Sequence, residues 1–202
     1  MGFRPTYFGS HNKPMSNPEP EAPGTGQTAP ASFSMPFDLL DACHDRVRRS
    51  LGLLARLVEH LRVRGDAVQA RDAACDVMRY FDVAAPQHHQ DEERHVFPRL
   101  EASGDLELAA LARRLRAEHR QIEGQWCALW PLLEQVVRQR DVDLGELDAA
   151  TRRFAQMIDQ HMRAEEQVAY PSARLSAVCE GPDAVRAMGE EMAARRGLRL
   201  PR

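Results

Sequence analysis

The sequence has few aromatic residues, no long apolar run and no excess of one charge. Phe, Trp and Tyr make up 6% of the 202 residues. No stretch approaches the roughly 20 consecutive apolar residues that span a bilayer as a helix. The formal net charge is −3, which is not the strongly basic balance typical of proteins that bind nucleic acid. We therefore expect no membrane partner and no nucleic-acid partner.

The four cysteines also lack the spacing of a disulfide framework or of a thiolate zinc site. Cys43, Cys75, Cys127 and Cys179 lie far apart, and none belongs to a Cys-x-x-Cys motif. Free thiols are typical of a reducing compartment. The first thirty residues lack the apolar middle region of a secretory signal, so the sequence predicts a cytoplasmic protein.

The chain divides into three regions by composition. Residues 1–35 combine six prolines with Gly, Ser, Thr and Asn, and such a segment buries too little apolar area to order itself, so we expect a disordered tail. Residues 36–172 are rich in Ala, Leu, Arg and Glu, which favour helices. Residues 173–202 predict a helical extension of short helices with Gly181-Pro182 between them.

Apolar residues recur every three or four positions through residues 36–172, which is the spacing of amphipathic helices. The predicted helices span approximately residues 36–65, 66–100, 105–138 and 146–171. Pro86 should kink the second helix and Pro131 should bend the third, while Pro98 and Pro171 should end their helices. Four long helices joined by short turns predict an all-α protein, an antiparallel up-down four-helix bundle.

Two segments of the chain repeat one motif. His88–Pro98 and His161–Pro171 both read His, three residues, Glu-Glu, three residues, an aromatic residue and Pro. Residues four apart lie on the same face of a helix, so each copy places an imidazole beside a carboxylate. The two matching copies predict a metal site.

A histidine replaces an apolar residue on the inner face of each predicted helix. Antiparallel packing would bring the four histidines to similar depths, together with one carboxylate from each motif copy. These six residues are His44, His88, Glu92, His119, His161 and Glu165. Burying such a set without compensation costs several kcal/mol per ionised group, whereas a metal ion satisfies both the lone pairs and the charge. Imidazole and bridging carboxylate together favour a pair of iron or manganese ions.

The remaining histidines and glutamates of these segments are predicted to lie outside the site. We expect His60 to be solvated, and His89 to lie about 100° away from the inner face, which makes His89 and Glu93 a weaker frame for the same motif. His95 is a candidate partner to a ligand, and Glu93 and Glu166 are predicted to be charged flanking residues.

In the order of these motifs, residues 36–172 resemble the hemerythrin family, specifically its bacterial HHE cation-binding branch. The resemblance implies a non-haem di-iron centre, with His44, His88, His119 and His161 as terminal ligands. It also implies that Glu92 and Glu165 bridge the two irons. A carboxylate-rich ferritin-like protein is rejected, because its Glu-x-x-His motif has the reverse order.

The sequence departs from the oxygen-carrying hemerythrins at two positions. Those proteins have a histidine where this chain has Glu123, four residues after His119, and we predict that Glu123 is a seventh ligand. They also place the last carboxylate five residues after its histidine, at the position of Glu166, whereas the HHE branch uses the spacing of Glu165. Both departures argue against simple reversible oxygen carriage.

Three functions remain open from the sequence. The first is a di-iron protein that binds or senses oxygen, nitric oxide or iron. The second is an enzyme that acts on peroxide or nitric oxide at an open iron position. The third is a zinc-bound or metal-free helical interaction module. No nucleophile or phosphate loop is visible outside the cluster, which favours the first, with a small diatomic ligand or peroxide as partner.

Overall fold

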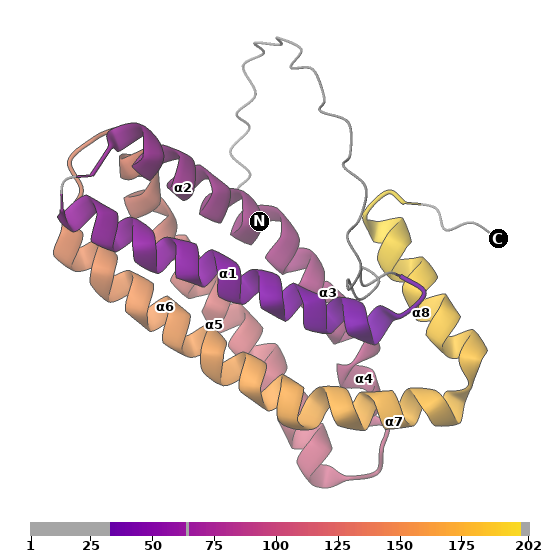
Figure 1. The fold of residues 1–202 in the computed structure, drawn as a ribbon. Coiled ribbons are helices and arrows are strands. Elements are labelled where there is room, and N and C mark those ends of the chain that lie inside the picture. The colour runs from indigo at the N-terminus through magenta and orange to yellow at the C-terminus, as the bar shows by residue number, and fades with distance from the viewer. Residues whose placement is uncertain (1–32, 64, 199–202) are drawn as a thin grey trace, which may run out of the picture. The chain divides into compact units, whose positions relative to one another are not determined.

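All regular secondary structure in residues 33–63 and 65–198, the part of the chain that the computed structural model describes, is helical (Figure 1). The elements are α1 (Pro36–Arg62), α2 (Ala67–Arg79), η1 (Tyr80–Ala84), α3 (Ala85–His95), α4 (Phe97–Glu101), α5 (Leu106–Val137), α6 (Leu144–Ala164), η2 (Glu165–Ala169), α7 (Tyr170–Glu180) and α8 (Pro182–Arg195). The all-α prediction is confirmed. Most of the predicted tail, residues 1–32, lies outside the described residues. No described helix is both long enough and apolar enough to cross a membrane.

The long helical segments pack around a shared interior. Helix α1 contacts α2 and α6, and α5 contacts the same two neighbours (Figure 1). Three of the segments begin at an aspartate whose side chain accepts hydrogen bonds from backbone N–H groups of the first turn. These N-caps are Asp66 for α2, Asp105 for α5 and Asp143 for α6. Short capped turns of this kind bring consecutive helices side by side.

Two five-residue π-helical turns interrupt the segments that carry the repeated motifs. One turn, η1, immediately precedes α3 and Pro86, and the other, η2, begins at Glu165. Helix α3 ends at His95, shortly before Pro98 as predicted, although a further helix, α4, begins at once. The prediction that Pro171 ends its helix is wrong, because η2 continues directly into α7 and Pro171 lies in the first turn of α7. A proline is tolerated there because the first-turn N–H groups have no intrahelical partner. π-Helical turns are often found at functional sites.

The interior consists of two apolar clusters with polar side chains between them. Along α1, Leu40 belongs to one cluster and Val47 to the other, with the buried His44 between them. Along α5, the buried His119 has the same position between Leu115 and Ile122. The histidines that the sequence places on inner faces therefore lie at one level of the interior.

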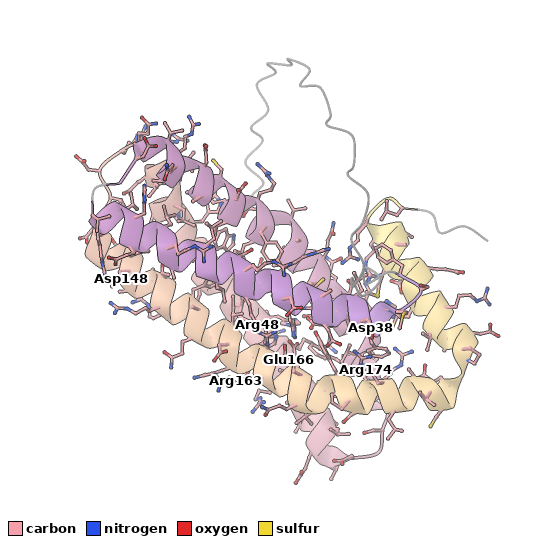
Figure 2. All side chains as sticks on the ribbon, in the orientation of Figure 1. Asp38, Arg48, Asp148, Arg163, Glu166 and Arg174 are labelled. Atoms are coloured by element: carbon pink, nitrogen blue, oxygen red, sulfur yellow. The ribbon has the colours of Figure 1, made fainter. Side chains whose placement is uncertain are left out.

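Ion pairs connect α1 to α6, η2 and α7 on the outer surface (Figure 2). Arg48 lies 2.5 Å from Glu166, and Arg174 lies 3.0 Å from Asp38. Exposed pairs of this kind contribute about 0–1 kcal/mol each, so they add little to stability. The Arg48–Glu166 pair nevertheless matters for the site, because Glu166 also contacts His44.

Helix α8 is held against α3 by a buried carboxylate. Asp91 is fully buried and pairs with Arg195 and Arg196, the latter at 2.7 Å. Gly189 of the same helix, α8, packs closely on the segment before α1, since a Cβ there would collide with the backbone carbonyl of Phe33. Asp91 directly precedes Glu92, so the docking of α8 is connected to the polar layer.

We expect Asp91→Asn to lower the free energy of unfolding of the metal-free protein by about 3 kcal/mol, because it removes the buried carboxylate charge that both Arg195 and Arg196 pair with. The matched control is Asp183→Asn, whose side chain is 90% exposed and pairs with Arg186. That control should change the stability by less than about 0.5 kcal/mol. Equal effects of the two variants in urea unfolding would contradict the importance of the Asp91 contact.

Candidate metal centre

Six of the seven residues predicted as ligands come together in the polar layer between the two apolar clusters. They are buried, with exposed fractions of 4% or less, and they come from α1, α3, α5, α6 and η2. The six are His44, His88, Glu92, His119, His161 and Glu165. The interior therefore holds the imidazole and carboxylate groups that the two motif copies predict.

The ligand atoms form two groups. In the first, one atom each from His44, His88, Glu92 and Glu165 lies within 4.8 Å of every other. In the second, the same holds for His89, His119 and His161. Each group has the composition and the spacing of a site for one metal ion.

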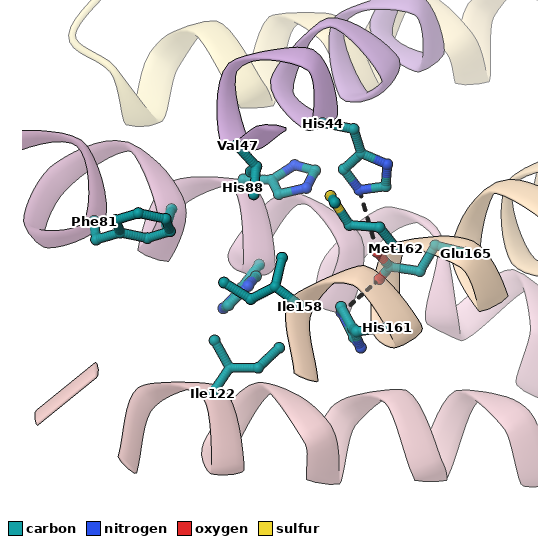
Figure 3. A pocket seen from close by; sticks show the side chains of 11 residues that line it. His44, Val47, Phe81, His88, Ile122, Ile158, His161, Met162 and Glu165 are labelled. Atoms are coloured by element: carbon teal, nitrogen blue, oxygen red, sulfur yellow. Dashed lines mark ion pairs between the residues drawn. The ribbon is translucent and has the colours of Figure 1, made fainter. Parts of the chain in front are cut away.

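Each of the two carboxylates faces both groups. Glu92 Oε1 lies 3.3 Å from His88 Nε2, while its Oε2 lies 3.5 Å from His119 Nε2. Glu165 Oε2 lies 3.2 Å from His44 Nε2, and its Oε1 lies 3.0 Å from His161 Nε2 (Figure 3). A carboxylate with one oxygen on each side can bridge two ions, and this chain places two such carboxylates side by side.

Three of the imidazoles are oriented from outside by a carboxylate. The pairs are His44 Nδ1 with Glu166 at 2.8 Å, His119 Nδ1 with Glu93 at 2.9 Å and His161 Nδ1 with Glu118 at 2.9 Å. The carboxylates in turn pair with Arg48, Arg116 and Arg114, respectively. Donation from Nδ1–H leaves the Nε2 lone pair facing the interior, which is the usual arrangement around a metal-bound histidine. Glu93 and Glu166, predicted as flanking charges, are therefore partners of ligand candidates, and Glu118 was missed.

When no metal is bound, protonated histidines balance the negative charge of the two buried carboxylates. Burial opposes protonation of His44, but the adjoining Glu165 and Glu92 outweigh it and raise its pKa to about 10. The same balance raises the pKa of His119 to about 10 and that of His161 to about 9. Burial disfavours the ionised form of both carboxylates as well, yet the surrounding imidazoles hold their pKa values below the usual range.

Several buried atoms of the cluster make no hydrogen bond within the described residues. They are His88 Nδ1, Glu92 Oε2, His119 Nε2, His161 Nε2 and both side-chain oxygens of Glu165. Unsatisfied polar atoms are rare in protein interiors, because each costs about 1–3 kcal/mol. Most of these atoms converge between the two groups, where metal ions would satisfy them. The residues present therefore fit a pair of metal ions.

His89 joins the cluster, whereas Glu123 does not. The ring of His89 stacks on that of His119, with centroids 3.9 Å apart, and burial lowers its pKa to about 3. Helix α3 has neighbours on two inner sides, so His88 can meet His44 while the next residue meets His119. The only sign of this role in the sequence is that His89 directly follows His88.

Glu123, predicted as a seventh ligand, has an exposed side chain and belongs to neither group of ligand atoms. The inner face of α5 continues from His119 to Ile122 and Trp126, which are buried, so position 123 turns toward solvent. His95 is also outside the cluster, where it pairs with Glu191 at 3.1 Å. Neither residue is brought within reach of the ligand atoms described above.

His60 and Cys43 both lie outside the set of candidate ligands. His60 is half-buried, not solvated, and its Nε2–H donates to the carbonyl oxygen of Asp66 at 3.0 Å, in the turn between α1 and α2. Cys43, next to His44, is buried, and burial raises its pKa to about 11, so it is not a reactive thiolate. All four cysteines are unpaired, as predicted.

A small cavity adjoins the cluster on the side of the apolar cluster that contains Phe81 (Figure 3). About 20 Å³ of it is open to the centre of a water molecule, which is room for about one small molecule. Its polar lining is His44, His88, His89, His161 and Glu165, and its apolar lining is Val47, Phe81, Ala85, Ile122, Ile158 and Met162. The candidate ligands thus face a small, mostly apolar space.

Residues 35–173 match the hemerythrin HHE cation binding domain, which is more than half of the chain. The chain belongs to the hemerythrin HHE cation-binding family. The resemblance inferred from the motifs is confirmed, and the match spans every residue of the cluster. Over 169 residues the chain is also 29% identical to an uncharacterized protein of Haemophilus influenzae (strain ATCC 51907 / DSM 11121 / KW20 / Rd). That similarity covers 84% of this chain and 94% of the relative.

Metal binding should release protons from His44, His119 and His161. A histidine binds metal through a neutral nitrogen, and at pH 7 these three carry protons in the metal-free protein because their pKa values are about 9 to 10. The affinity for Zn²⁺ should therefore rise from pH 7, by about tenfold per pH unit for each displaced proton, and level off above about pH 10. An indicator dye in weakly buffered protein would report the protons. No release at pH 7 would contradict the site.

Proposed function

We propose that this HHE-family protein holds a bridged pair of non-haem iron ions inside an antiparallel up-down four-helix bundle. In this proposal His44 and His88 bind one ion, and His89, His119 and His161 bind the other. Glu92 and Glu165 bridge the pair. The observation that supports it is that each carboxylate directs one oxygen to each group of imidazoles. Mixed imidazole and carboxylate ligation favours iron over metals that prefer thiolates.

The two ions would differ in their protein ligands. Beside the shared carboxylates, one has two imidazoles and the other has three. The ion at His44 and His88 therefore has more room for an external ligand. Such a centre supplies a redox-active metal with a free coordination position.

We infer that the external ligand is a small diatomic molecule, oxygen or nitric oxide, which the protein binds or senses. The cavity beside the cluster has room for about one such molecule, and six of its lining residues are apolar. An apolar lining favours an uncharged ligand over water or a charged one. Val47, Phe81 and Ile158 would exclude water from the metal pair. The unpaired cysteines support a reducing compartment, and we propose that the protein acts in the cytoplasm.

The first test is the metal content and ligand binding of protein purified from iron-replete cells. We expect about two irons per chain, and a change in the optical spectrum of the reduced protein when nitric oxide or oxygen is added without turnover of peroxide. Zinc alone, or one ion per chain, would overturn the di-iron proposal. Sustained turnover of peroxide would assign the centre to an enzyme instead.

The ligand assignment is tested by single substitutions of His89, a proposed ligand, and Glu123, which is not part of the proposed ligand set. His89→Gln should lose metal because it removes one of three imidazoles from its group, whereas Glu123→Gln should keep two irons because its side chain is exposed. His88→Ala serves as the reference for loss of a ligand, and His60→Ala as the control outside the cluster. Iron analysis of the four variants decides it. Loss of iron in Glu123→Gln with retention in His89→Gln would reverse the assignment.

A further inference from the structure

The two motif copies end in different aromatic residues, and both lie against the candidate centre. Phe97 follows the first copy, and its ring centroid lies 5.3 Å from that of His119. Tyr170 follows the second copy, and its ring stacks on His44 at 5.1 Å. Both side chains are buried, with exposed fractions of 0% and 2%. The equivalent positions thus differ by a hydroxyl group, and that hydroxyl is on the His44 side.

The Tyr170 hydroxyl contacts two of the candidate ligand atoms. It lies 3.0 Å from His44 Nε2 and donates to Glu92 Oε1. The direction of the second bond follows from chemistry, because an ionised carboxylate offers acceptor atoms only. The other oxygen of Glu92, which faces His119, makes no hydrogen bond within the described residues. One bridging carboxylate is therefore hydrogen-bonded on one side and not on the other.

Tyr170 belongs to one apolar cluster, whereas the apolar residues that line the cavity belong to the other. The 11 described residues that line the cavity include His44 and Glu165 but not Tyr170. A molecule in the cavity would therefore not touch the phenol. Any influence of Tyr170 on the metal pair has to pass through Glu92 or His44.

We propose that Tyr170 is a positioning residue that makes the two metal sites unequal, by withdrawing electron density from the Glu92 oxygen that faces His44 and His88. This inference rests on the proposed di-iron function and goes beyond it. A hydrogen bond to a carboxylate ligand weakens its donation to the metal, and a weaker anionic donor stabilises the less charged, ferrous ion. The ion at His44 and His88 is thereby the one that is more easily kept reduced, on the same side where the protein supplies fewer imidazoles.

The test is Tyr170→Phe, which removes one oxygen atom and keeps the ring that packs on His44. The matched control is Tyr80→Phe, because Tyr80 donates to the carbonyl oxygen of Cys43 at 3.3 Å and contacts none of the candidate ligands. We expect Tyr170→Phe to keep two irons, to have a lower reduction potential and to be oxidised by air about tenfold faster than the unmutated protein. The size follows from the loss of one hydrogen bond to a charged acceptor. Tyr80→Phe should leave the potential and the rate unchanged.

Each other outcome has a definite meaning. An unchanged potential and oxidation rate in Tyr170→Phe, with iron retained, would overturn the inference and leave the di-iron proposal intact. Loss of iron from Tyr170→Phe would also overturn it, because the tyrosine would then be needed to hold the metal instead of tuning it. Unmutated protein that contains no iron would overturn both proposals, and this measurement is made first.

Discussion

The structure depends on satisfying a layer of ionisable side chains that divides its apolar interior into two parts. Four imidazoles and two carboxylates are buried there, and a fifth imidazole, from His89, is half-buried beside them. Removing such groups from water is affordable only when opposite charges or metal ions compensate them. Protons on three histidines supply this compensation in the metal-free chain, and metal ions would supply it through the same atoms. Folding and metal binding therefore depend on the same imidazole and carboxylate atoms.

Charges of alternating sign also surround the centre, in the order imidazole, glutamate and arginine. Each of three imidazoles contacts a half-buried glutamate, and each glutamate contacts an arginine. The same device appears at Asp91, whose charge is balanced by two arginines at the end of α8. Arginines that look like an ordinary solvated face in the sequence thus fix the orientation of buried groups. Their exposed pairs contribute little stability, but they set the direction in which each Nε2 points.

Much of the fold and six of the cluster residues could be predicted from the sequence, because they follow from helical periodicity. The inner-face histidines and the two His-x-x-x-Glu frames need only a repeat of three or four residues to be recognised. His89 and Glu123 could not be resolved in this way, since a helix with two inner neighbours buries adjacent residues toward different partners. The unbroken continuation of the helical segment through Pro171 was not predicted, for a local reason. A proline is compatible with the first turn of a new helix. The spacing of apolar residues does not reveal where one helix ends and the next begins.

The exchange of Glu123 for His89 also changes the expected chemistry. A seventh ligand from Glu123 would add a third negative charge about 2 Å from the metal pair and would favour the ferric state. In the proposed ligand set the seventh ligand is a neutral imidazole, so the two bridging carboxylates are the anionic ligands. The ferrous state is then less disfavoured. Of the two departures that argue against reversible oxygen carriage, the glutamate in place of a histidine on α5 then no longer applies, while the spacing of Glu165 remains. The asymmetry that such binding requires would come from three imidazoles on one ion, two on the other, and the Tyr170 hydroxyl on the side of the two.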